Sequence, residues 1–523
     1  MRLCKNAIIL ISFVWGPSAA MAAPGGLEPA DRALLADYAR DTWRSIAALA
    51  ERGALPADSL RRTETGWVVD GLTSPTNVAA YLWSTVAAED MHLISSEEAG
   101  RRIGQTLATL AQLERSHGFY FNWYDPSNGM RAQTWPTGGD LRPFLSVVDN
   151  GWLAAALIVI GNHRPEYRDA AEAILLPMNF GFFYDPYDPV NPAEHPGLLR
   201  GGFWPDDGTY AGFHYGALNT EPRIASYIGI ARGQLPAEHY FRMFRTSQEP
   251  PRKPSPEGNT YVGVAVNEGT LSYRGMQIVP TWDGTMFEAL MVPLLVPEAD
   301  WAPRSWGANH PLYVRAQIEY GLRDAQLGYW GLSAACTPGG GYGAYGVAAL
   351  GVRTHSEHLT RPREGIIAPY ASFLALPFAP AETLANLKAL SAKFPVYDTF
   401  GFHDSVNVLT GQVSDRVLIL DQGMILASLS NVIGGDVLRR SFCAGPVEAT
   451  IRPLIALERF DVRIDSSSSS LKNQSPEEYN PLAGEPLPST DRSRPFGRSP
   501  LGRQHLVGGL LTAAGLSAVI VRR

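Results

Sequence analysis

The sequence has few cysteines, few charged residues and no excess of basic residues, and each shortage excludes a class of protein. Three cysteines among 523 residues cannot supply a disulfide scaffold or a four-cysteine zinc site. Only 18% of the residues are charged, and 44 Lys and Arg stand against 51 Asp and Glu, which gives a net charge of −7. Because no basic stripe is present either, we expect no nucleic-acid partner.

Several catalytic and nucleotide-binding motifs are also absent. The sequence contains no H-E-x-x-H, no G-x-S-x-G and no P-loop, and its eleven histidines are scattered, so we expect neither a metal nor a cofactor. Residues 341–346 match G-x-G-x-x-G, but no strand precedes them and no acidic residue follows at the expected distance. We interpret this segment as a Gly/Tyr-rich loop.

Aromatic residues, glycine and proline are plentiful instead. The chain has 12 Trp, 21 Tyr and 20 Phe beside 51 Gly and 40 Pro, and 45% of its residues are hydrophobic. This composition predicts a globular, monomeric protein with many ordered loops and much aromatic surface. Cys336 and Cys443 could pair in an oxidising compartment, which the sequence alone does not decide.

The two ends of the sequence are predicted to lie outside the folded domain. Residues 1–22 have the basic start, apolar run and small-residue site of a signal peptide. Residues 464–504 form a Ser/Pro-rich linker, and residues 505–523 form a short hydrophobic anchor or sorting tail closed by two arginines. We therefore expect an exported protein, periplasmic or at the cell surface, with a membrane tether at residues 506–521. The alternative is a last helix that packs back onto the domain of residues 23–463.

Helical patterns dominate that domain, and they alternate between two kinds. The amphipathic segments are residues 32–51, 97–115, 165–178, 236–245, 310–325 and 381–393. The segments that are apolar on nearly every side are residues 78–87, 152–160, 224–230, 286–295, 366–376 and 424–432. A helix that is apolar all round is buried. The alternation predicts an all-α fold of six helical hairpins with inner and outer rings, which is an (α/α)6 barrel.

Acidic residues stand at the starts of several apolar segments, namely Asp149, Glu221, Asp283 and Asp421. Each could simply cap its helix or favour the helix dipole. Parallel inner helices would nevertheless gather these acids at one end of the barrel, beneath aromatic loops at residues 119–124, 203–204, 213–215 and 329–330. A pocket that combines carboxyl groups with aromatic side chains is typical of carbohydrate hydrolysis, because two carboxyl groups act on the glycosidic bond and on water. We therefore expect an oligo- or polysaccharide substrate.

Longer stretches resemble a known family. The runs GFYFNWYD (118–125), LSVVDNGWLAAAL (145–157), HYGALNTEPRIASYIGIARGQLP (214–236), WDGTMFEALM (282–291), FGFHDSVN (400–407) and LDQGMILASLSNVI (420–433) are similar to the glucoamylase-like domain. YWGLSA (329–334) and GIIAPYASFLALPF (365–378) continue the resemblance, which is collinear over residues 118–440. This domain occurs in bacterial endo-β-1,2-glucanases and cyclic β-1,2-glucan synthases. The resemblance implies an (α/α)6 barrel that acts on β-1,2-glucan.

The resemblance also implies roles for single residues. Glu221 matches the acid at the glycosidic oxygen, and Asp404 is our choice for the base that activates water, directly or through a substrate hydroxyl. Asp149 matches a carboxylate of the family's pocket that steers the substrate. The residues expected to bind substrate are Trp123, Tyr124, Trp152, Tyr215, Arg223, Trp282, Asp283, Glu288, Trp330, Phe402, His403, Asp421 and Gln422.

Two departures from the family pattern bear on the mechanism. The hydrolases often carry a Glu at the position of Trp152, and the synthases tend to carry one at the position of Ala334. These losses favour an inverting hydrolase, whose two carboxyls would stand about 6.5–9.5 Å apart. They leave open a non-catalytic glycan-binding or exopolysaccharide-export accessory protein. A hydrolase or transglycosylase for another polysaccharide is a third hypothesis, because loops such as residues 185–205 and 246–275 would set the linkage preference.

Overall fold

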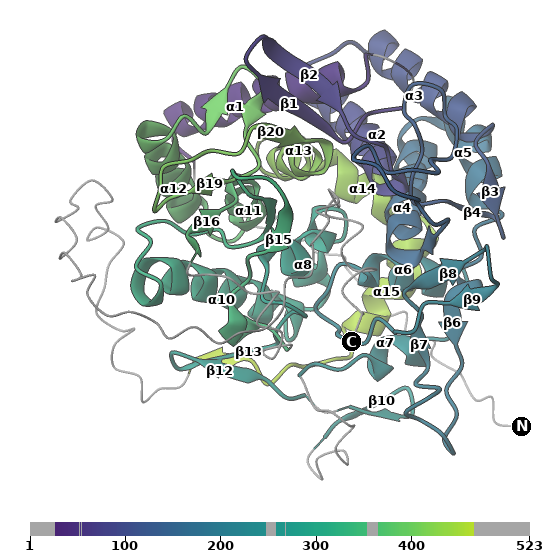
Figure 1. The fold of residues 1–523 in the computed structure, drawn as a ribbon. Coiled ribbons are helices and arrows are strands. Elements are labelled where there is room, and N and C mark those ends of the chain that lie inside the picture. Colours follow the sequence, from purple (N-terminus) through teal and green to yellow (C-terminus); the bar gives the residue numbers. More distant parts are fainter. Residues whose placement is uncertain are drawn as a thin grey trace, which may run out of the picture.

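The computed structural model of the protein describes residues 27–464, apart from residues 52, 54, 247–257, 267 and 353–363 (Figure 1). The predicted signal peptide and tail lie outside these residues, as does the predicted linker beyond Ile464. Within the described ranges, no helix is both long enough and apolar enough to cross a bilayer. The fold is mostly helical, which confirms the helical class, and its strands have only two to five residues.

Six helices at the centre of the fold are buried on nearly every side, and each corresponds to one of the predicted apolar segments. They are α2 (Pro75–Asp90), α4 (Val147–His163), α6 (Arg223–Ala231), α8 (Met286–Leu290), α11 (Pro369–Ala375) and α13 (Ile419–Ile433). Helix α2 packs on α4, α4 on α6, α8 on α11, α11 on α13, and α13 returns to α2 (Figure 1). The Arg223 guanidinium joins α6 to α8 by donating to the carbonyl oxygens of Glu288 (3.2 Å) and Ala289 (2.9 Å).

The amphipathic helices cover this centre. They are α1 (Pro29–Leu49), α3 (Ser96–Leu110), α5 (Arg168–Leu175), α7 (Glu238–Arg242), α10 (Trp306–Glu319) and α12 (Pro380–Lys393). Helix α1 packs on α13, α3 on α2, α5 on α4, α10 on α8 and α12 on α11. The helix expected at residues 236–245 is only five residues long. Helix α15 (Pro446–Ile455), which the sequence did not predict, packs on α6 instead.

Prolines account for two differences between the expected and observed helices. The segment at residues 286–295 divides after Leu290, and a 3-10 turn over Val292–Leu294 contains Pro293, which lacks the N–H that a continuing helix needs. The segment at residues 366–376 begins as strand β16 (Ile366–Ile367), because the residue before Pro369 is held in an extended conformation. The short helices α9 (Glu298–Trp301) and α14 (Val437–Cys443) were not predicted.

Short antiparallel sheets of two or three strands surround the helical core. The sheets are β1 (Ser59–Thr63) with β2 (Gly66–Asp70) and β20 (Arg416–Leu418); β3 (Arg115–Ser116) with β4 (Phe119–Tyr120); β5 (Leu145–Ser146) with β8 (Gly202–Trp204) and β9 (Thr209–Tyr210); β6 (Tyr184–Asp185) with β7 (Leu198–Leu199); β10 (Thr260–Tyr261) with β11 (Val264–Ala265); β12 (Leu271–Tyr273) with β13 (Met276–Ile278) and β21 (Arg463–Ile464); β14 (Ala334–Cys336) with β15 (Tyr342–Ala344); β16 with β19 (Val406–Asn407); and β17 (Tyr397–Asp398) with β18 (Gly401–Phe402). Strand β5 runs directly into α4, and β20 runs directly into α13. These strands therefore mark where the inner helices begin.

A fully buried ion pair stabilises the junction of α6 with α9. The Arg223 guanidinium donates to both carboxylate oxygens of Glu298, at 2.8 and 2.9 Å, and both side chains are 0% exposed. The Tyr227 hydroxyl donates to the same carboxylate at 2.7 Å, and His310 Nε2 lies 3.1 Å from it. These partners lower the pKa of Glu298 to about 2 despite its burial.

We expect Glu298→Ala to lower the free energy of unfolding by about 3–5 kcal/mol, because it leaves the Arg223 charge buried without a partner. Glu448→Ala is the control, since Glu448 pairs with Arg452 on the surface and the loss should be below about 1 kcal/mol. Urea unfolding followed by circular dichroism measures both. Equal loss in the two variants would contradict the assigned role of the buried pair.

Candidate active site

Glu221 lies just before α6, and its side chain is almost completely enclosed, with the residue 3% exposed. The Trp152 indole donates from Nε1 to Oε2 of Glu221 at 3.1 Å. Burial raises the pKa of Glu221 to about 8, and the neighbouring charge of Asp149 raises it further, while the indole hydrogen bond acts in the opposite direction. Glu221 therefore keeps its proton at neutral pH.

Asp149 occupies the first turn of α4, where its backbone N–H donates to Oγ of Ser146 at 3.2 Å. The Thr76 hydroxyl, in the first turn of α2, donates to Asp149 Oδ1 at 2.6 Å. Burial raises the pKa of Asp149 to about 6, against the effect of these hydrogen bonds. Oδ2 has no hydrogen-bond partner among the described residues. Asp149 thus brings a carboxyl group near Glu221 with one oxygen uncommitted.

The turn before α8 adds two further carboxyl groups. The backbone N–H groups of Trp282 and Asp283 donate to Oε2 of Glu288, at 2.8 and 3.3 Å. Gly284 makes this turn possible: its φ is +81°, and a Cβ there would lie 2.0 Å from the carbonyl oxygen of Val347. Burial raises the pKa of both Asp283 and Glu288, and the charge of Glu221 raises that of Glu288 further.

Asp404 belongs to a second acidic group, with Asp421 and Asp58. The backbone N–H of Cys336 donates to Asp404 Oδ2 at 2.6 Å, and the carboxyls of Asp404 and Asp421 hydrogen-bond to one another. Burial raises the pKa of Asp404 to about 7, while burial and the Asp404 charge hold the pKa of Asp421 well above its usual range. Asp421 is therefore the proton donor of this pair, and Asp404 is the member that ionises first. Asp58 has a pKa raised to about 7 by burial and adds like charge nearby.

Tyr370 of α11 lies between the two acidic groups. Its hydroxyl donates to the carbonyl oxygen of Ala334 at 2.8 Å, and the charges of Asp421, Asp404 and Asp283 all raise its pKa. Burial is the largest cause of that raised pKa, and the three carboxyls lie within electrostatic range of the Tyr370 hydroxyl. Asp283, before α8, and Asp421, in the first turn of α13, thus act on the same hydroxyl as Asp404 does.

The chain matches known families in two regions. Residues 249–444 match the family model described as "Putative glucoamylase", and residues 38–181 match a model for proteins of unknown function, DUF3131. The cyclic β-(1,2)-glucan synthase NdvB of Rhizobium meliloti is 23% identical over an alignment that covers 78% of this chain. That alignment covers only 18% of the synthase, so the chain corresponds to a small part of that protein.

Solved structures share the architecture at low sequence identity. An endo-β-1,2-glucanase from Chitinophaga pinensis has a TM-score of 0.60 at 14% identity, covering 82% of this chain and 98% of that chain. A variant of an endo-β-1,2-glucanase from Talaromyces funiculosus has a TM-score of 0.58 at 12% identity, covering 82% of this chain and 90% of that chain. The chain has the glucoamylase-like fold. The expected resemblance is thereby confirmed.

Of the residues expected to bind substrate, several do lie beside these acids in the glucoamylase-like fold. Trp152 contacts Glu221, and Trp282, Asp283 and Glu288 share the turn before α8. Asp421 lies against Asp404, as a proton donor to it. Tyr215 is partly exposed and packs edge-on against Phe213.

The other residues expected to bind substrate are in contact with neighbouring protein groups. Arg223 is committed to Glu298, Gln422 donates to the Phe402 carbonyl, and the Tyr124 hydroxyl donates to the Glu114 carbonyl. The remaining four have similar structural surroundings: Trp123 packs on Trp135, Trp330 is 1% exposed in the core, Phe402 packs on Tyr38 and Phe373, and His403 contacts Ser414 and Asp398. All seven side chains thus have contacts within the protein, and their contact with substrate stays a prediction.

The sequence reading missed three residues that shape the site. Thr76 was missed because α2 was expected to begin at residue 78, although Ser74-Pro75 is a recognisable helix start and Ser74 does cap the helix. Tyr370 was treated only as part of a buried helix. Asp58, just before β1, carried no pattern that separated it from a surface acid.

Neither a metal site nor a disulfide is found in the described part of the chain. No group of three or more His, Cys, Asp or Glu residues there could hold a metal ion. Cys336 and Cys443 are both free and buried, so the suggested pairing is not present. Cys336 lies in β14 beside Asp404, whereas the Cys443 thiol donates to the Leu295 carbonyl.

The raised pKa of Glu221 predicts a pH-dependent stability. Glu221 has a pKa of about 8 in the folded protein, against 4.5 for an ordinary Glu, which stands for the unfolded state. Proton binding at Glu221 therefore contributes fully to the unfolding free energy at low pH, and this contribution is lost as the pH rises toward 8. Relative to wild type, Glu221→Gln should therefore gain roughly 3 kcal/mol of unfolding free energy between pH 5 and pH 8. Urea unfolding at the two pH values measures this gain. A constant difference between the two proteins would contradict the raised pKa.

Proposed function

We propose that the protein is an exported, endo-acting glycoside hydrolase of β-1,2-glucan, and that its six inner helices close an (α/α)6 barrel around the site. The proposal draws support from the glucan named for the aligned synthase and for the two glucanases of the same fold. Export and tethering rest on the sequences of residues 1–22 and 505–523 alone.

One observation supports the catalytic part of the proposal: Glu221 and Asp404 differ in their pKa and in the groups that set it. Glu221 has a pKa of about 8 and no cation close enough to offset its burial, so it is protonated near pH 7. Asp404 has a pKa of about 7 and accepts hydrogen bonds from Asp421 and from the Cys336 amide, which stabilise its ionised form. An acid and a base that function at one pH are what glycoside hydrolysis requires.

Glu221 is the general acid of this mechanism. Because the Trp152 N–H already donates to Oε2, the carboxyl proton belongs on Oε1. Oε1 therefore points its proton at the glycosidic oxygen, and it transfers that proton as the C–O bond breaks.

Asp404 is the general base. It accepts a proton from the attacking water, either directly or through a hydroxyl of the bound sugar, and water attacks from the side opposite the leaving group. Asp149, with Oδ2 uncommitted, accepts a hydrogen bond from a sugar hydroxyl near Glu221. The product then has the inverted anomeric configuration.

Replacing Glu221 by Gln should lower reducing-sugar release from linear β-1,2-glucan by about a hundredfold to ten-thousandfold, because the amide cannot protonate the leaving oxygen. Asp404→Asn should cause a similar loss. Reducing-end assays give the rates, and proton NMR during the first turnovers gives the anomer of the product.

A panel of β-glucans with other linkages serves as the substrate control, and circular dichroism verifies that both variants fold. Turnover of Glu221→Gln close to that of wild type would overturn its assignment. Binding of glucan by the wild type without cleavage of any glucan would favour an accessory glycan-binding protein.

Trp152→Phe should move the alkaline limb of the pH–rate profile upward from about pH 8 by about one pH unit. The indole hydrogen bond stabilises ionised Glu221, so its loss raises the pKa of that group. Trp83→Phe is the control for packing: it removes a buried indole that packs edge-on against Trp152 and donates from its own N–H to the Gly423 carbonyl at 3.0 Å rather than to an acid. An identical shift in both variants would show that Trp152 does not act through Glu221.

A further inference from the structure

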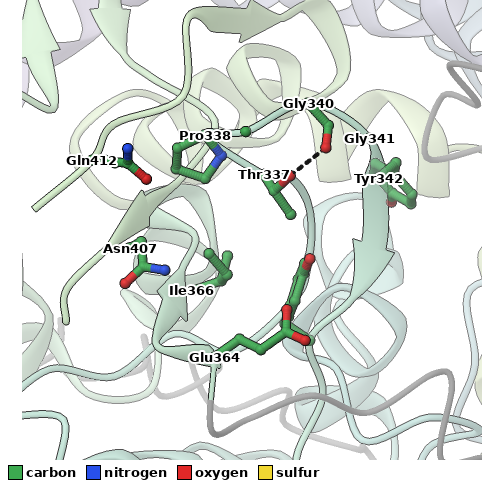
Figure 2. Close-up of a pocket in the computed structure, with 11 residues that line it drawn as sticks. Thr337, Pro338, Gly340, Gly341, Tyr342, Glu364, Ile366, Asn407 and Gln412 are labelled. Carbon is green, nitrogen blue, oxygen red and sulfur yellow. Dashed lines mark hydrogen bonds between the residues drawn. The ribbon is translucent and has the colours of Figure 1, made fainter. Parts of the chain in front are cut away.

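A polar pocket of about 360 Å³ adjoins the Asp404 side of the candidate site (Figure 2). One wall is the turn between β14 and β15, and the opposite wall is the β16–β19 pair with the segment that follows it. The lining residues are Thr337, Pro338, Gly339, Gly340, Gly341, Tyr342, Tyr345, Glu364, Ile366, Asn407 and Gln412. Its volume is within the range of small-ligand sites.

Both walls are continuous with the segments that hold Asp404. Strand β14 ends at Cys336, whose amide donates to Asp404, and the next residue, Thr337, is the first of the pocket. On the other side, Asn407 follows Asp404 by three residues, and the Ser405 hydroxyl donates to the Cys336 carbonyl. The same two segments therefore hold Asp404 and form the walls of the pocket.

The lining favours a neutral, hydroxyl-rich ligand. None of the described lining residues is Lys, Arg or His, so these residues offer no positive charge to a phosphate or a uronic acid. Asn407 Oδ1 accepts from the backbone N–H groups of Leu409 and Thr410, at 3.0 and 3.1 Å, which leaves its Nδ2 as a donor. Figure 2 shows that nitrogen on the side of Ile366, facing the turn that carries Thr337. Sugar hydroxyls can accept from such an amide and donate to backbone carbonyls.

The three glycines in the turn between β14 and β15 leave open space beside the backbone. A Cβ at Gly339, Gly340 or Gly341 would meet no atom of the described residues within 4 Å. Gly340 and Gly341 have φ of +88° and +89°, so the backbone needs glycine there, whereas Gly339 has no such constraint. The open space beside Gly339 allows a ring to approach the backbone closely.

We propose that this pocket is a subsite for a neutral sugar unit of the glucan chain, beyond the unit that reacts between Glu221 and Asp404. This inference rests on the proposed function. The subsite adds affinity for long chains and takes no part in bond cleavage.

The test uses the full chain with two substrates: polymeric β-1,2-glucan and the shortest β-1,2-linked oligomer that is cleaved. Gly339→Leu places a side chain in the open space, Gly339→Ala is the graded control, and Gln412→Ala removes a polar group of the opposite wall. Gln105→Ala, on the outer helix α3, is the surface control. Calorimetric binding of polymer in the Glu221→Gln background gives affinity independently of turnover.

Gly339→Leu should raise KM for the polymer roughly threefold to tenfold and leave its kcat unchanged. The oligomer should be cleaved as by wild type. Smaller increases are expected for Gly339→Ala and Gln412→Ala, and none for Gln105→Ala. Unchanged KM for the polymer, or equal losses on polymer and oligomer, would overturn the subsite while leaving the hydrolase intact. A wild-type protein that neither binds nor cleaves β-1,2-glucan would overturn the proposed function as well.

Discussion

The ion pair between Arg223 and Glu298 is the interaction on which the rest of the site depends. Arg223 follows Glu221 by only two residues, and a free guanidinium there would stabilise ionised Glu221 and remove its proton. Glu298 takes two of the guanidinium N–H groups, and backbone carbonyls take others. The positive charge is thereby neutralised, and of the effects that set the pKa of Glu221 it is the smallest. The same pair joins α6 to α8 and α9, so the packing of the helices and the protonation of the acid have a common origin.

In the second acidic group, burial raises the pKa of Asp404, while hydrogen bonds from Asp421 and the Cys336 amide and the charge of Arg416 lower it. Three carboxyls, those of Asp58, Asp404 and Asp421, lie together, and burial raises the pKa of each. Asp421 retains a proton and directs it to Asp404, and the Cys336 amide adds a second donor. Asp404 can therefore carry the negative charge of the group. Because Thr337 and Asn407 extend the two segments that hold it, the base and the neighbouring pocket are positioned by the same backbone.

The sequence predicted the helices better than the residues around the site. Segments such as residues 152–160 are apolar on nearly every side, which is typical of a buried helix, so all six inner helices were predicted. Glu221 and Asp149 were found because they start such runs. Phe402 and Trp330 are buried, and the sequence could not predict this because an aromatic ring has the same sequence signature in a core and in a sugar-binding cleft. Strands of two residues are too short to show any sequence period. Helix α15 was not predicted, and it packs on α6, where the longer helix expected at residues 236–245 was to lie.

Trp152 places an indole N–H, rather than a carboxyl group, beside Glu221. A carboxylate at this position would have brought another like charge next to Glu221, whereas the indole brings a single N–H donor and no charge. That donor selects which oxygen of Glu221 carries the proton and limits how far burial raises its pKa. At the other departure, Ala334 contributes only its carbonyl, which accepts from Tyr370. Trp152 and Ala334 thus supply hydrogen bonds and no carboxyl, which leaves Glu221 and Asp404 as the acid and base of the proposed single-displacement hydrolysis.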